Sequence, residues 1–214
     1  MKLAFSGLLP YPLEEMTHAK NSFWQHGSCV FTPGNNYEII ASSGRGKTTL
    51  LNVIFGIRND YHGQFIIEEK QANKLKLSDW ARIRTHKISS VFQGLRLFRH
   101  LTGKQNIDIK NRLTGTLTDQ QINNLAKILG IEQQMSQKAG LMSYGQQQRL
   151  AVLRAFAQPF EWLLLDEPFS HLDPETAQIT ADLIRNECIV RSANFIVTRL
   201  MSEDYLQANE EIIL

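Results

Sequence analysis

The sequence predicts an α/β protein with a mainly parallel central sheet. Apolar runs at residues 37–41, 162–166 and 194–198 have the length and composition of fully buried strands. A glycine-bearing turn and an apolar helical stretch, residues 48–56, follow the first run, and another helical stretch at residues 145–157 precedes the second. Strands that alternate with helices in this way are typical of a parallel sheet covered by helices.

Apolar periodicity and turn residues indicate the remaining elements. Residues 65–68 and 88–92 are further strand candidates, each bounded by polar or turn residues. From about residue 101 to 140 the pattern becomes polar and helical, and residues 118–130 place four apolar side chains on one helix face: Ile122, Leu125, Ile128 and Leu129. We therefore expect a single domain over residues 1–214, with a helical subdomain at approximately residues 95–150.

Composition indicates an ordinary globular chain. Hydrophobic residues make up 43% and charged residues 21% of the 214 residues, and the formal charge is only +2. This small charge does not favour a nucleic-acid partner. The two cysteines, Cys29 and Cys188, are far apart and outside any Cys/His cluster, so neither a disulfide framework nor a zinc site is indicated and a reducing cytosol is expected.

The sequence contains no segment suited to entering a membrane. The apolar run near the N-terminus is interrupted at Gly7, Pro10 and Pro12 and lacks the small-residue cleavage site of a signal peptide. Elsewhere no run reaches about 18 apolar residues. We expect no direct membrane insertion, so that any work at a membrane depends on a partner.

Residues 41–48, Ala-Ser-Ser-Gly-Arg-Gly-Lys-Thr, fit the Walker A phosphate-loop pattern except that Ala41 replaces its first glycine. Backbone N–H groups at such a helix start form a concave anion site, Lys47 places a charge on the β/γ-phosphates, and the Thr48 hydroxyl is the expected Mg²⁺ ligand. If position 41 requires a positive φ, the methyl group costs on the order of 1 kcal/mol. The alternative is a turn that only connects a strand to a helix. The predicted phosphate-contact residues are Ala41, Ser42, Ser43, Gly44, Arg45, Gly46, Lys47, Thr48 and Thr49.

Residues 162–168, Trp-Leu-Leu-Leu-Asp-Glu-Pro, form an apolar strand that ends in two carboxylates. This run resembles a Walker B motif followed by a catalytic glutamate. The resemblance implies that Asp166 can accept from magnesium-bound water and that Glu167 can polarise the water that attacks a γ-phosphate. Taken alone, such a pair is more often a solvated turn.

Between these motifs, residues 142–149 read Met-Ser-Tyr-Gly-Gln-Gln-Gln-Arg. This segment resembles the LSGGQQQR signature of ATP-binding cassette (ABC) ATPases, with Met142 and Tyr144 as departures. In that family the serine and glycine at this helix start face the γ-phosphate held by the opposite subunit, which implies nucleotide contacts by Ser143, Gly145 and Gln146. Tyr144 adds bulk near that interface.

Three further stretches carry the same resemblance. Residues 91–93, Val-Phe-Gln, are similar to the Q-loop, whose glutamine reaches the magnesium and the attacking water. Residues 95–106 resemble the LFPHLTVxEN run that follows it, with Arg99 in place of proline. Residues 170–173, Ser-His-Leu-Asp, resemble the D-loop, so the resemblance covers residues 34–198 in family order.

The resemblance implies a P-loop NTPase fold with an N-terminal antiparallel β region and a helical subdomain that carries the signature. It implies ATP and Mg²⁺ as cofactors, Glu167 and Gln93 as catalytic residues, Thr48 and Gln93 as metal ligands, and Asp166 as a further site residue. It also implies a homodimer in the ATP state and integral membrane permease subunits as partners, with the chain on the cytoplasmic, inner face of the membrane.

Two family elements are altered. The aromatic residue that stacks on adenine is not fixed by the sequence, and His18, Tyr11 and Trp24 remain open, with Trp24 better explained as a core residue of a half-buried strand. Arg199 stands where the family has a switch histidine. Because a guanidinium only donates, Arg199 can pair with phosphate or with Glu167 but cannot accept a hydrogen bond, which predicts slow hydrolysis and a faster Arg199→His variant. The alternative is that Arg199 points to solvent.

The leading hypothesis is therefore the ATPase subunit of a transporter. A soluble ABC-class ATPase acting on chromosomes, ribosomes or cofactor assembly is the alternative, but residues 49–141 are too short for a long coiled coil, and only one cassette is present. A third hypothesis is an ATP-binding switch with little hydrolysis, suggested by Arg199.

Overall fold

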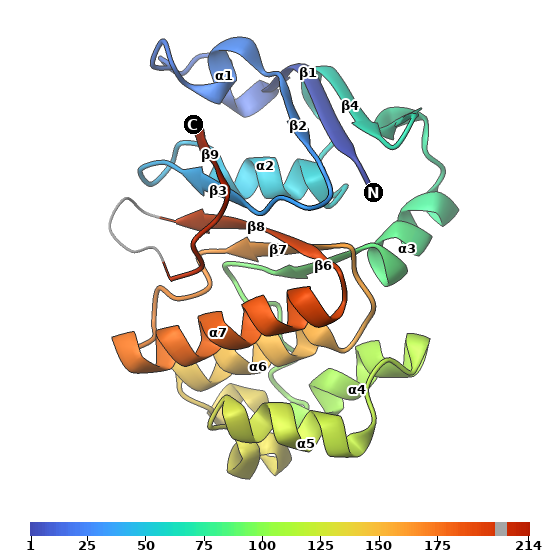
Figure 1. Cartoon of the computed structure of the whole chain (residues 1–214), viewed down its shortest axis with the longest axis vertical. Coiled ribbons are helices and arrows are strands. Elements are labelled where there is room, and N and C mark those ends of the chain that lie inside the picture. Colours follow the sequence, from blue (N-terminus) through green and yellow to red (C-terminus); the bar gives the residue numbers. More distant parts are fainter. Residues whose placement is uncertain (200–204) are drawn as a thin grey trace.

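The computed structural model describes residues 1–199 and 205–214, and these residues form two β-sheets with helices between and beside them (Figure 1). The smaller sheet is antiparallel, with the order β2-β1-β4-β5. Its strands are β1 (Leu3–Pro10), β2 (Cys29–Phe31), β4 (Tyr61–Ile67) and β5 (Lys70–Gln71). The larger sheet is parallel, with the order β6-β7-β8-β3-β9. Its strands are β3 (Tyr37–Ile40), β6 (Ile88–Val91), β7 (Trp162–Asp166), β8 (Asn194–Arg199) and β9 (Glu210–Ile213).

Helix α2 lies between the two sheets, and helices α6 and α7 cover the opposite face of the parallel sheet (Figure 1). Helices α4 and α5 lie beyond them, at one end of the molecule. The α-helices are α1 (Phe23–His26), α2 (Lys47–Ile54), α3 (Leu77–His86), α4 (Gly103–Thr114), α5 (Asp119–Ile128), α6 (Tyr144–Phe156) and α7 (Pro174–Val190).

The side chains of β7 alternate between two hydrophobic cores. Trp162 and Leu164 join the core that contains α2 and the antiparallel sheet, whereas Leu163 and Leu165 join the core that contains α6 and α7. Successive side chains of a strand point to opposite faces, so a strand with a core on each face is apolar throughout. This burial holds Asp166, the last residue of β7, at the edge where the sheet meets the phosphate loop.

The predicted α/β class with its mainly parallel sheet is confirmed, and three details differ. Trp24 lies on α1 rather than on a strand. Ile128 is 50% exposed, and Ala126 is buried on the core side of α5 instead. The prediction also lacked β9, which extends the sheet by pairing in parallel with β3.

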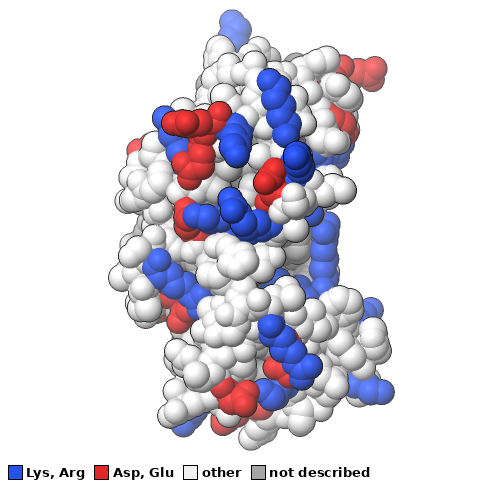
Figure 2. Space-filling view, turned by 90° about the vertical axis from the view of Figure 1, so that its right-hand side faces the viewer, with Lys and Arg blue, Asp and Glu red and all other residues white. Residues whose placement is uncertain are grey.

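The face shown in Figure 2 carries basic and acidic side chains that are interspersed over its length. This arrangement agrees with the small net charge of +2. Within residues 1–199 and 205–214, no helix has the length and apolar character needed to cross a membrane.

Lys110 is a partly buried cation in the helical region. Its Nζ lies 3.4 Å from the Ser89 hydroxyl oxygen, and burial, together with the nearby Arg154, lowers the pKa of Lys110 from 10.5 to about 7. Between these two pH values the unfolded chain binds one proton more than the folded chain, so the free energy of unfolding rises with pH across that window. Below about pH 7 the folded protein carries the full cost of the buried charge.

We expect Lys110→Met to stabilise the protein by about 1–3 kcal/mol at pH 6.5, and by much less at pH 10, because it removes this cost. Chemical unfolding at the two pH values measures the difference. The exposed Lys127 on α5 offers a control, since Lys127→Met is expected to change stability by less than about 0.5 kcal/mol at either pH. If Lys110→Met destabilised the protein at pH 6.5, this would contradict the conclusion that the charge of Lys110 lowers the stability of the folded protein.

Candidate nucleotide-binding site

The loop between β3 and α2 has the geometry of an anion site. Gly44 and Gly46 adopt φ values of 79° and 94°, in the left-handed region that favours glycine. A Cβ on Gly46 would also lie 2.7 Å from Leu13 Cδ1, so the loop packs closely on the N-terminal segment beneath it. Helix α2 begins at the next residue, and its first N–H groups therefore face the loop. Ala41 does not adopt a positive φ, so its methyl group adds no backbone strain.

A cavity of about 230 Å³ lies at this loop. It brings together eight of the predicted site residues: Ser43, Gly44, Gly46, Lys47, Thr48, Thr49, Gln93 and Glu167. They come from three separate parts of the chain, namely the loop and start of α2, the segment after β6, and the segment after β7. The parallel order of β3, β6 and β7 in one sheet places these three segments at one edge.

Lys47 is a cation in the lining of this cavity. Its Nζ donates to the carbonyl oxygens of Ala41 at 2.8 Å and Ser42 at 3.3 Å, and lies 3.2 Å from Glu167 Oε1. The side chain is only 5% exposed. An incoming phosphate would compete with the Glu167 carboxylate for this ammonium group.

Oxygen atoms that could serve as ligands of Mg²⁺ lie beside Lys47. The Thr48 hydroxyl donates to Gln93 Oε1 at 3.4 Å, and buried Asp166 accepts from Thr198 Oγ1 at 2.9 Å. Burial raises the pKa of Asp166, while the Thr48 and Thr198 hydroxyl groups beside it act in the opposite direction.

The part of the chain that the structure describes contains no group of three or more His, Cys, Asp or Glu side chains arranged for a metal ion. Mg²⁺ is usually bound by one or two carboxylates together with substrate phosphates and water, so a hydroxyl, an amide and one carboxylate fit this ion.

Glu167 has a strained backbone. Its φ of 49° is unusual for a residue other than glycine and costs of order 1–3 kcal/mol. Its N–H donates to Thr198 Oγ1 at 3.0 Å, and its carbonyl oxygen accepts from Gln148 Nε2 at 3.2 Å. The prediction missed Thr198 and Gln148 as supports, because nothing in the sequence distinguishes them from other residues of a buried strand and a helix.

The signature residues lie at the start of α6. Ser143 accepts from the Gln146 N–H at 3.3 Å, and the Gln146 side chain accepts from the Ser143 N–H at 2.9 Å, forming a capping box. Gly145 packs on the 170–173 segment, where an added Cβ would lie 3.2 Å from the carbonyl oxygen of His171. These signature residues are not among those that line the cavity of the same chain.

The three candidates for adenine stacking differ in accessibility. Trp24 is only 4% exposed, and its Nε1 donates to the carbonyl oxygen of Arg45 at 2.9 Å. Trp24 therefore stabilises the backbone of the phosphate loop. Tyr11 is 51% exposed, with its ring centroid 4.9 Å from that of His62. His18 Nε2 lies 2.9 Å from the carbonyl oxygen of Leu13. Tyr11 and His18 remain as candidates.

Arg199 is held by an acidic residue of the neighbouring strand. Its guanidinium forms a two-pronged ion pair with the buried carboxylate of Glu38 on β3, one of whose bonds, from Nη2 to Oε2, measures 2.9 Å. Glu167 pairs with Lys47 instead. Of the two partners considered for Arg199, phosphate and Glu167, the structure contradicts Glu167, because the parallel register places β8 beside β3 and aligns Arg199 with Ile40.

We expect Arg199→Met to destabilise the protein by about 2–4 kcal/mol, because it leaves the Glu38 carboxylate buried without this partner. The double variant Arg199→Met with Glu38→Met should lose less than the sum of the two single variants, which a double-mutant cycle of urea unfolding measures. Additive losses would contradict the pairing.

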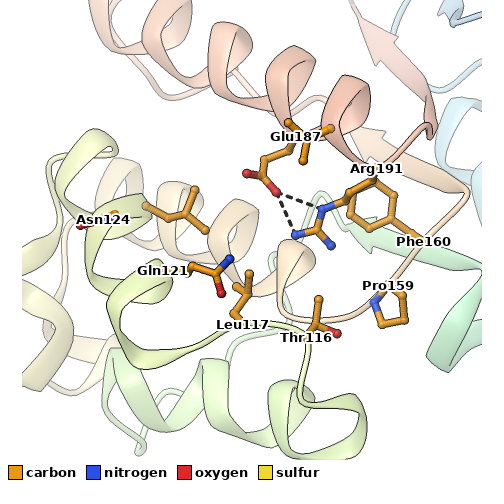
Figure 3. A pocket seen from close by; sticks show the side chains of 10 residues that line it. Thr116, Leu117, Gln121, Asn124, Pro159, Phe160, Glu187 and Arg191 are labelled. Carbon is orange, nitrogen blue, oxygen red and sulfur yellow. Dashed lines mark hydrogen bonds and ion pairs between the residues drawn. The ribbon is translucent and has the colours of Figure 1, made fainter.

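A larger cavity, of about 510 Å³, lies away from the phosphate loop, between the loop after α4, helix α5 and the end of α7 (Figure 3). Its cation, Arg191, is bound to Glu187 and to the carbonyl oxygens of Phe156 and Gln158, and it stacks on Phe160 at 4.9 Å. The guanidinium thus stabilises the end of α7, and its partners are groups of the protein itself.

Comparison with known proteins agrees with this geometry. The sequence profile described as "ABC transporter" matches residues 25–170. The chain is 35% identical over 169 residues to the thiamine import ATP-binding protein ThiQ of Haemophilus ducreyi, covering 77% of this chain and 76% of that protein. It is 31% identical to the probable sulfate/thiosulfate import ATP-binding protein CysA of Chlorella vulgaris, covering 85% of this chain and 75% of that protein.

Other relatives are longer. The chain is 29% identical to the macrolide export ATP-binding/permease protein MacB of Campylobacter jejuni over 78% of its length, but spans only 26% of that protein.

Among solved structures, the dimeric bacterial ABC transporter cassette MJ0796 superposes with a TM-score of 0.76 at 23% identity, covering 92% of this chain and 87% of that one. The chain belongs to the ABC transporter family.

Proposed function

We propose that this chain is the ATP-binding and ATP-hydrolysing subunit of an ABC transporter, and that it closes as a head-to-tail homodimer on ATP to drive partner subunits in the membrane. The observation that carries this proposal is the cavity at the phosphate loop, which gathers Lys47, Thr48, Gln93 and Glu167 from three segments of the chain. A turn that only connects β3 to α2 would not require these residues to converge.

The residues divide the chemistry among them. The N–H groups from Gly44 to Thr48 would bind the phosphates, and Lys47 would exchange Glu167 for the β/γ-phosphates. Glu167, once released from Lys47, would polarise the attacking water. Mg²⁺ held by Thr48 and Gln93, with Asp166 behind it, would neutralise charge on the phosphates.

The proposed partners follow from the relatives. ThiQ and CysA are named as import ATP-binding proteins and MacB as an export ATP-binding/permease protein, so the relatives include both directions of transport. We assign this chain to the cytoplasmic face of a membrane, bound to separate permease subunits. The signature residues Ser143, Gly145 and Gln146 would contact the nucleotide held by the other copy.

Two experiments test the proposal. Phosphate release by the purified protein is expected to require both ATP and Mg²⁺, and its absence would contradict the enzymatic part. Affinity purification of the chain from membranes solubilised in mild detergent is expected to recover an integral membrane protein in stoichiometric amount. Recovery of the chain without such a protein would favour a soluble ABC-class ATPase.

The hypothesis of a switch with little hydrolysis was suggested by Arg199 in the place of the switch histidine. One route to slow hydrolysis, in which Arg199 draws Glu167 away from the attacking water, is not supported, because Arg199 is paired with Glu38. Glu167 itself lies in the cavity beside Lys47.

A further inference from the structure

Tyr144, the first residue of α6, contacts two segments of the same chain. Its hydroxyl donates to the backbone carbonyl oxygen of Gln93 at 3.2 Å. Its ring meets the ring of His171 edge-on, with centroids 4.3 Å apart and planes inclined by 67°. The residue is 45% exposed, so these contacts are made at the surface rather than in the core. A glycine at this position could make neither contact.

Gln93 connects Tyr144 to the phosphate loop. Its side-chain oxygen accepts from the Thr48 hydroxyl at 3.4 Å, and both residues line the nucleotide cavity. The main chain of Gln93 is thus bound to α6 while its side chain faces α2. Two consecutive hydrogen bonds therefore connect Tyr144 through Gln93 to Thr48.

The segment after Gln93 is bound to α6 at a second place. Leu95 and Arg96 both adopt a positive φ, of 56° and 48°. Their carbonyl oxygens each accept from the Arg154 guanidinium at 2.6 Å. Because Arg154 lies in the last turn of α6 and Tyr144 in the first, the two ends of this helix hold the segment that begins at Gln93.

The start of α6 is itself fixed against the 170–173 segment. Gly145 approaches the His171 carbonyl oxygen so closely that a Cβ there would lie 3.2 Å from it. The ring of His171 packs edge-on against Tyr144. This packing positions the Tyr144 hydroxyl for its bond to Gln93.

We propose that Tyr144 is a positioning residue, whose hydroxyl holds the backbone of Gln93 so that the side-chain amide faces Thr48 and is ready to engage Mg²⁺. The proposal rests on the proposed function, since it concerns binding of Mg²⁺ with ATP. Through this contact, Tyr144 connects the residues proposed to bind Mg²⁺, Thr48 and Gln93, to α6, the helix that carries the signature residues of the same subunit.

The variant Tyr144→Phe tests this proposal, because it removes the hydroxyl and retains the ring against His171. A neutral hydrogen bond contributes about 0.5–1.5 kcal/mol, so the affinity for ATP in the presence of Mg²⁺ should fall about 2- to 10-fold. The affinity for ATP in EDTA should not change, because the phosphate loop is untouched. Titration of a fluorescent ATP analogue under both conditions measures the two affinities.

A second readout needs no nucleotide. Backbone amides of residues 92–97 should exchange with deuterium about 2- to 10-fold faster in Tyr144→Phe than in the wild type, because one of the two places at which α6 holds this segment is lost. Tyr61→Phe serves as the matched control, since Tyr61 lies on β4 in the other sheet, and it should change neither readout.

The variant Tyr144→Gly removes both contacts and should lower the Mg²⁺-dependent affinity at least as much as Tyr144→Phe. Wild-type affinity in Mg²⁺ for both variants, with unchanged exchange at residues 92–97, would overturn the proposal. A wild-type protein that binds no ATP in either condition would overturn the proposed function and this inference together. A wild type that binds ATP equally with and without Mg²⁺ would overturn the inference alone.

Discussion

Lys47→Ala should weaken ATP binding by about 100-fold or more. The mutation removes the charge-assisted bonds to the β/γ-phosphates. It also leaves the Glu167 carboxylate without its ion-pair partner, 3.2 Å away in the wild type, where the negative charge repels an incoming phosphate. Titration of a fluorescent ATP analogue measures the loss.

Arg45→Ala is the matched control for this experiment, because Arg45 is a second cation of the same loop. Its guanidinium donates to the carbonyl oxygen of Thr17 at 3.0 Å, outside the residues that line the cavity. We expect its affinity for ATP to change by less than about 3-fold. Unchanged affinity in Lys47→Ala would mean that the loop only connects β3 to α2, and equal losses in both variants would mean that the loop's charge matters but not its position.

Glu167→Gln should lower the turnover of ATP by about 10² to 10⁴, the usual effect of losing a positioned base. Binding should be retained or become tighter, because the neutral amide no longer competes with phosphate for Lys47. An ATP-bound dimer should accumulate, which size-exclusion chromatography with ATP and Mg²⁺ detects.

The exposed Glu69, between β4 and β5, provides the control variant Glu69→Gln, for which neither turnover nor elution volume should change. A Glu167→Gln protein that remains monomeric and is as active as the wild type would contradict both the catalytic role of Glu167 and the closure of two copies on ATP.

Much of the site could be predicted because its residues are adjacent in the sequence to the strands and helices that position them. The phosphate loop directly follows β3, and Asp166 and Glu167 end β7, so the buried runs also locate the chemical groups. Because β3, β6 and β7 run parallel in one sheet, their carboxyl ends lie on the same side of it. Gln93, which follows β6, can therefore reach Thr48.

The parts that could not be predicted depend on pairing between distant segments. Arg199 forms an ion pair with Glu38 because β8 lies beside β3, and no local pattern contains that register. Strand β9 was missed for a similar reason: it is short and mostly exposed, and its partner, β3, lies far away in the sequence.

Tyr144 illustrates the same limit at the site itself. From the sequence it is only a residue that adds bulk near the expected interface between subunits. In the structure it binds the carbonyl oxygen of Gln93 and packs on His171 within one chain. These contacts join segments that lie far apart in the sequence.

The most direct test of the account is isothermal titration of the wild-type protein with a non-hydrolysable ATP analogue in the presence of Mg²⁺. The cavity lined by Lys47, Thr48, Gln93 and Glu167 predicts saturable binding of one nucleotide per chain, and loss of that binding in Lys47→Ala. Absence of binding to the wild type, or binding that Lys47→Ala leaves intact, would contradict the assignment of this cavity as the nucleotide site.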